Sequence, residues 1–108
     1  MWICDNEGFL SIVENRNDDE TLLVRARTEK HLLSVFPDCE LFTDPSADYP
    51  YRAYIKRQTV ADTIAIRLLL TDYDNFKASV NEARLHDAYN DMWRVLWHEF
   101  YPERELVQ

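Results

Sequence analysis

Two short stretches of alternating residues decide the fold of this chain: TLLVRAR at residues 21–27 and YRAYIK at residues 51–56. In the first stretch, Leu22, Val24 and Ala26 lie on one side of an extended chain, and the cations lie on the other. A period of two is typical of a β-strand with one buried face. Both stretches are therefore expected to be strands of one sheet, with helices covering its apolar side.

The sequence around these strands predicts further elements. Apolar residues at 2–4 and 9–14 flank a turn, DNEG at residues 5–8, and indicate an N-terminal hairpin in which Gly8 takes a positive φ. Thr28 is a suitable N-cap for a short helix over residues 29–36. A further short strand is expected at residues 40–43, and a loop is expected at residues 44–50.

Three helical segments are expected after residue 56. The first begins at the capping-box-like TVAD of residues 59–62, ends near residues 70–72, and buries three apolar residues one turn apart, Val60, Ile64 and Leu68. The second is a short piece, residues 75–80, capped by Asp74.

The third helix, residues 83–100, has the strongest pattern, with an apolar stripe made by Leu85, Tyr89, Met92, Leu96 and Phe100. Trp93 and Trp97 widen this stripe, and Val95 lies on the opposite side. A helix that is apolar over so wide an arc needs two covering surfaces. One is expected to be the sheet, and the other a partner protein or a second copy.

The order of these elements is hairpin, strand, helix, strand, strand, helix, helix, helix. Its central βαββα order is ferredoxin-like, which predicts an α+β fold with an antiparallel sheet of four to five strands packed against helices. A length of 108 residues and a mass of 12.9 kDa correspond to a single domain. Residues 103–108 are expected to be a frayed tail.

Composition excludes several classes of protein. Hydrophobic residues make up 46% of the chain, so it is globular, and no apolar run approaches the roughly 20 residues of a membrane span. The N-terminus lacks the features of a secretion signal, so a cytoplasmic address without membrane contact is expected. One glycine is too few for a phosphate loop or a dinucleotide fingerprint. Cys4 and Cys39 are not spaced as metal ligands, which leaves no cofactor or metal to expect.

The chain is acidic, with 20 Asp and Glu against 12 Lys and Arg and a formal charge of −8. Such a balance disfavours binding to nucleic acid, which depends on cations that neutralise phosphates. The acids at Asp18, Asp19 and Glu20 either maintain solubility or steer the chain toward a basic partner.

Several motifs occur in a familiar order: MWI and GFLS near the N-terminus, LLVRAR at 22–27, DY and YRA within 48–53, DYDNFK at 72–77 and HDAY at 86–89. Over most of residues 1–93, their order and spacing resemble a family of short, uncharacterised bacterial and phage proteins. The resemblance implies one domain and a bacterial or phage origin, and no activity or cofactor. A phage origin favours a protein that occupies a host protein's surface, as an inhibitor or accessory factor.

Strand alternation also predicts a cationic face on the sheet, formed by Arg25, Arg27, Arg52, Tyr54 and Lys56. If the two strands are neighbours, four cations and a tyrosine gather there and could hold an anion, a nucleotide or an acidic peptide. The alternative is a solvated face on which the cations pair with two acids, Glu14 and Glu40.

An enzyme would need a histidine, His31, His86 or His98, brought next to an acid in a cleft. His86 and Asp87 are adjacent on a helix and diverge by about 100°, so they are not expected to face each other. No serine or cysteine is placed by spacing to act as a nucleophile. No catalytic residue is therefore assigned.

The leading hypothesis is a small acidic protein-binding module that associates with a larger, basic host protein. Its expected contact residues are Asp18, Asp19, Glu20, Trp93, Trp97 and Tyr101. Tryptophan and tyrosine are common at the centres of protein interfaces. A homodimer, the anion-binding domain and the small enzyme remain alternatives.

Overall fold

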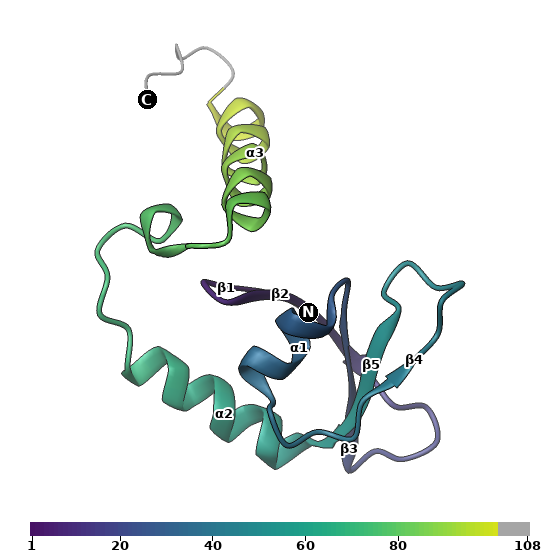
Figure 1. The fold of residues 1–108 in the computed structure, drawn as a ribbon. Helices are drawn as coiled ribbons and strands as arrows, with labels where there is room; N and C mark the ends of the chain where they lie inside the picture. The colour runs from purple at the N-terminus through teal and green to yellow at the C-terminus, as the bar shows by residue number, and fades with distance from the viewer. Residues whose placement is uncertain (102–108) are drawn as a thin grey trace.

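The structure is a computed structural model that describes residues 1–101. Its sheet is antiparallel throughout, with five strands in the order β1-β2-β3-β5-β4 (Figure 1). The strands are β1 (Trp2–Asp5), β2 (Gly8–Glu14), β3 (Thr21–Ala26), β4 (Phe42–Thr43) and β5 (Tyr51–Lys56). The helices are α1 (Glu29–Val35), α2 (Arg57–Leu69), the 3-10 turn η1 (Lys77–Ser79) and α3 (Ala83–Phe100). The predicted α+β class is confirmed.

The two alternating stretches are the central pair of the sheet. β3 pairs with β5 in a register that sets Val24 opposite Ala53 and Arg25 opposite Arg52. Val24 and Ala53 have no exposed surface. Helix α1 follows β3, and β5 then lies between β3 and β4, which is the split βαβ arrangement that the element order predicts. Strand β2 flanks β3 on the other side.

The core lies between the sheet and the helices α1 and α2. Thr28 caps α1, its Oγ1 accepting a hydrogen bond of 3.2 Å from the amide of His31. The buried residues come from β2, β3, β5 and the two helices: Leu10, Ile12, Val24, Ala26, Leu32, Val35, Phe36, Ala53, Ile55 and Val60. Each large side chain of this set stabilises the fold by about 1.5–3 kcal/mol relative to its exposed state.

Gly8 is needed for close packing and not for a turn conformation. No residue in 1–101 has a positive φ, so the expectation for Gly8 is wrong. A Cβ added at Gly8 would lie 2.8 Å from the carbonyl oxygen of His31 and 2.9 Å from its Cα. The missing side chain lets the first turn of α1 lie against the hairpin.

Helix α2 begins earlier than the capping motif predicts. It starts at Arg57, directly after β5, and Lys56 provides no side-chain cap. The predicted stripe is also only partly right, because Val60 is buried but Leu68 is 70% exposed. Beyond Ile64 the inward position is taken by Arg67, which reaches the hairpin. The turn η1 is shorter than the predicted segment, residues 75–80, and it has no side-chain cap, so the cap expected from Asp74 is wrong.

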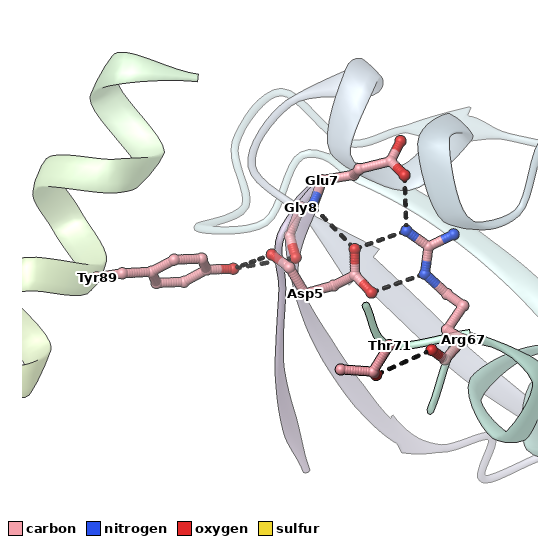
Figure 2. A network of polar contacts seen from close by, with 6 residues as sticks. All are labelled: Asp5, Glu7, Gly8, Arg67, Thr71 and Tyr89. Carbon is pink, nitrogen blue, oxygen red and sulfur yellow. Dashed lines mark hydrogen bonds and ion pairs between the residues drawn. The ribbon is translucent and has the colours of Figure 1, made fainter. Parts of the chain in front are cut away.

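Asp5 joins α2 and α3 to the hairpin. Arg67 makes two hydrogen bonds of 2.7 Å to the Asp5 carboxylate and one of 3.1 Å to Glu7 (Figure 2). From the other side, the hydroxyl of Tyr89 donates to the carbonyl oxygens of Asp5 and Gly8 at 2.8 and 3.1 Å. The side-chain bonds to Asp5 raise the pKa of Arg67 further above its usual value.

Helix α3 departs most from expectation. Its bounds agree with the prediction, but α3 does not lie on the sheet and instead projects away from it (Figure 1). Leu85 and Tyr89 are its buried residues, and they pack with Val80 against Phe9, Phe76 and Met92. The sheet therefore covers little of the α3 stripe. The predicted frayed tail, 103–108, lies outside the described residues.

Replacing Gly8 with alanine should destabilise the fold by about 1–3 kcal/mol, because the new methyl group forces α1 away from the hairpin. Urea denaturation followed by circular dichroism measures this loss. The control is Ala65→Ser on the exposed side of α2, expected to change stability by less than about 0.5 kcal/mol. Equal stability of Gly8→Ala and wild type would contradict the close approach.

Replacing Arg67 with glutamine should cost about 1–3 kcal/mol, because it leaves the half-buried Asp5 carboxylate without its cation. The side chains of Arg67 and Asp5 are 24% and 13% exposed, so solvent only partly replaces the pair. A double-mutant cycle with Asp5→Asn, measured by urea denaturation, should give losses that are not additive. Additive losses would show that the two side chains are not coupled.

Candidate functional site

The apolar stripe of α3 is divided into a packed half and an exposed half. Leu85 and Tyr89 are about 5% exposed or less, whereas Leu96 and Phe100 are 57% and 71% exposed. All four residues lie on one side of the helix, since they recur at helical spacing. The stripe therefore continues past the point where the domain stops covering it.

The direction of α3 is fixed at its packed half. Tyr89 is 4% exposed, lies 6.5 Å from Phe9 and 5.1 Å from Phe76 between ring centroids, and holds the hairpin carbonyls. Burial raises the pKa of Tyr89, and the nearby Asp5 adds to this. These contacts anchor the packed half of α3 at the hairpin.

The three aromatic residues predicted as contacts form one row along α3. Trp93 and Trp97 are 5.5 Å apart, and Trp97 and Tyr101 are 5.1 Å apart, between ring centroids. The ammonium group of Lys77 lies 4.0 Å from the centre of the Trp93 ring, a cation–π contact that orders the start of the row. Trp93 and Trp97 are half-buried, and Tyr101 is 45% exposed.

The most exposed apolar residues of α3 are not those predicted as contacts. Val95, Leu96 and Phe100 are 57–71% exposed, although Leu96 and Phe100 belong to the same predicted stripe as the buried Leu85 and Tyr89. The wide apolar arc, with Val95 opposite the tryptophans, is the sequence feature that could have identified them. Helix α2 exposes a second apolar group that sequence reasoning missed, Ile66, Leu68, Leu69 and Leu70.

The predicted acidic contact residues lie at the other end of the molecule from α3 (Figure 1). Asp18, Asp19 and Glu20 are exposed in the connection between β2 and β3, beyond the end of β2 that is remote from Tyr89. Arg57 donates from its side chain to the carbonyl oxygen of Asp19 and from its amide to that of Glu20. The acidic loop and the aromatic row therefore do not form one surface.

Four of the five residues predicted for the cationic face lie on one side of the sheet, and Arg27 follows directly after the end of β3. Arg25 lies opposite Arg52, and Tyr54 and Lys56 follow on the same side of β5. Within residues 1–101 no carboxylate lies within 4.0 Å of the four cations, so the expected pairing with Glu14 and Glu40 is wrong.

Two of these arginines are engaged inside the protein. Arg25 donates to the hydroxyl of Ser11 at 2.6 Å, and Arg52 donates to the carbonyl oxygen of Tyr49 at 3.0 Å. The buried Tyr49 ring lies beneath both Arg25 and Arg27, at 4.8 and 4.3 Å from ring centre to guanidinium carbon. Arg27 and Lys56 remain the most exposed cations of the face.

One histidine does meet an acid. His31 Nε2 lies 2.6 Å from Glu82 Oε2, and the His31 side chain is 9% exposed. Its other nitrogen, Nδ1, is buried without a hydrogen-bond partner in the described residues. The pair therefore connects α1 to the start of α3.

The other two histidines lie on the surface of α3. His86 Nδ1 and Asp87 Oδ1 are 3.3 Å apart, so the expectation that these neighbours do not face each other is wrong. The contact is longer than the roughly 2.7–3.2 Å of an ordinary hydrogen bond and both side chains are exposed, so it is weak.

Burial raises the pKa of the Cys39 thiol, which does not favour a nucleophilic thiolate at this position.

Replacing Tyr89 with phenylalanine should destabilise the fold by about 1–3 kcal/mol, because two carbonyl oxygens at the hairpin lose their donor. Since the folded state raises the pKa of Tyr89, its neutral form stabilises the fold below roughly pH 10, the usual pKa of tyrosine, and this contribution is lost at higher pH. Urea denaturation at pH 7 and above pH 10 should show the gap between the two proteins narrowing. A constant gap would contradict this role for the phenol.

Comparisons with protein-family models, with curated proteins and with solved structures gave no match. No helix within residues 1–101 is long and apolar enough to span a membrane. The same residues contain no cluster of three or more His, Cys, Asp or Glu side chains arranged to hold a metal ion. The chain's own geometry is therefore the basis for assigning a function.

Proposed function

We propose that this protein is a protein-binding module that docks through the C-terminal half of α3. The observation that carries the proposal is the continuous stripe, which is packed at Tyr89 and exposed at Leu96 and Phe100. An amphipathic helix that leaves its domain with an apolar face is a common way to enter a partner's groove.

The exposed half has the size and composition of an interface centre. Residues 93–101 span roughly 13 Å along the helix. Trp93, Trp97 and Tyr101 provide a stacked aromatic row, which loses little conformational freedom on binding because Lys77 and the stacking already order it. Leu96 and Phe100 are exposed next to this row, and Val95 is exposed on the opposite side of the helix.

Charge favours a basic partner over a second copy. Each chain carries a formal charge of −8, so two copies repel each other, whereas a protein with Lys and Arg around an apolar groove is attracted. In this arrangement the acidic loop attracts the basic partner through its charge and does not contact the docking surface, because the loop lies at the opposite end of the molecule from α3. An inhibitor or accessory factor of a host enzyme, as the phage resemblance implies, would bind in this way.

Photo-crosslinking tests the docking surface. Benzoylphenylalanine in place of Leu96 should give a discrete adduct with a basic protein in cells that produce the chain, and the complex should weaken as salt is added. The matched control places the same probe at Asp87, which is exposed on the polar side of α3. Adding Phe100→Glu to the Leu96 probe should remove the adduct.

Three outcomes would refute the proposed surface. Equal adducts at positions 87 and 96 would show collision without specific binding. An adduct with the mass of two chains, supported by a dimer in light scattering, would identify a second copy as the occupant. No adduct at position 96 would show that this half of α3 is not covered.

A further inference from the structure

A cavity of about 390 Å³ lies between the hairpin, the start of α1 and the packed half of α3. It is separate from the exposed half of α3, because it uses the N-terminal part of that helix. Most of its wall is apolar and includes Trp2, Phe9, Leu85, Ala88, Tyr89 and Met92. Such a concave, largely apolar site with a few polar groups is the usual form of a small-molecule site.

The polar groups of this cavity leave an excess of positive charge. Arg27, Arg84, His31 and Glu82 line it, and the carboxylate of Glu82 is already held by His31 at 2.6 Å. Within residues 1–101 neither arginine has a carboxylate within 4.0 Å, and both are exposed. Two unpaired arginines at one cavity contrast with the acidic balance of the chain.

Arg27 is also held in position for a ligand. Its guanidinium carbon lies 4.3 Å from the centre of the Tyr49 ring and 5.8 Å from that of Phe9, and Phe9 is itself a wall of the cavity. Trp2 packs edge-on against Phe9 with centroids 5.6 Å apart. A guanidinium held against aromatic rings loses less freedom when it binds an anion.

We infer that this cavity binds a small organic acid with an apolar body, whose anionic head is held by Arg27 and Arg84. Planar guanidinium groups match the geometry of carboxylates and phosphates. The apolar walls favour an aromatic or hydrocarbon body, because they offer a sugar or an inorganic ion few hydrogen bonds. A cationic ligand would be repelled by both arginines.

Calorimetric titration with 2-naphthoate tests this inference. The matched probes are 2-naphthamide, which has the same body without the charge, and inorganic phosphate, which has the charge without the body. We expect naphthoate to bind with saturation and the two probes to bind at least about tenfold more weakly, since a hydrogen bond to a charged group contributes strongly in an apolar site.

Two variants and a control locate the ligand. Arg84→Gln, at an exposed position, should weaken naphthoate binding about tenfold or more. Ala88→Trp should fill the cavity and abolish binding, with circular dichroism to check its fold. Arg16→Gln, exposed in the loop at the other end of the molecule, should leave binding unchanged.

The inference is overturned if naphthoate shows no saturable binding by about 1 mM. It is also overturned if naphthamide or phosphate binds as well as naphthoate, because then either the charge or the body is not recognised. Binding that Arg84→Gln leaves unchanged would place the acid elsewhere. None of these results bears on docking by α3, so the two proposals fail independently.

Discussion

The structure depends on the turn end of the N-terminal hairpin, where one residue is held from two directions. The carboxylate of Asp5 receives the guanidinium of Arg67 from α2, and its carbonyl oxygen receives the hydroxyl of Tyr89 from α3 (Figure 2). Residues 5, 67 and 89 are far apart in the sequence, so these contacts close large loops and fix both helices relative to the sheet. The absence of a side chain at Gly8 allows α1 to approach the same point.

This anchoring has a direct consequence for the surface of the protein. Tyr89 holds α3 at the hairpin, and the stripe that begins at Leu85 continues beyond the part of the helix that the domain covers. An exposed apolar surface of this kind carries a cost in water, which a bound partner would remove. The same constraint therefore stabilises the fold and supports the proposed docking role.

The distribution of charge separates two kinds of recognition on one small chain. Acidic residues dominate overall, yet the cavity beside the packed half of α3 presents Arg27 and Arg84 without carboxylate partners in the part of the chain that is described. Long-range attraction of a basic protein and short-range capture of an organic acid can coexist, because salt screens the field over about 8–10 Å.

Sequence alone determined the sheet, since period-two alternation at residues 21–27 and 51–56 depends only on neighbouring residues. It also determined the bounds of α3 and the common face of Arg25 and Arg52. The tertiary structure decided where α3 points, why Gly8 is small, and that His31 meets Glu82. Those features arise from contacts between residues about 20 to more than 80 positions apart, and no local periodicity records which distant groups meet.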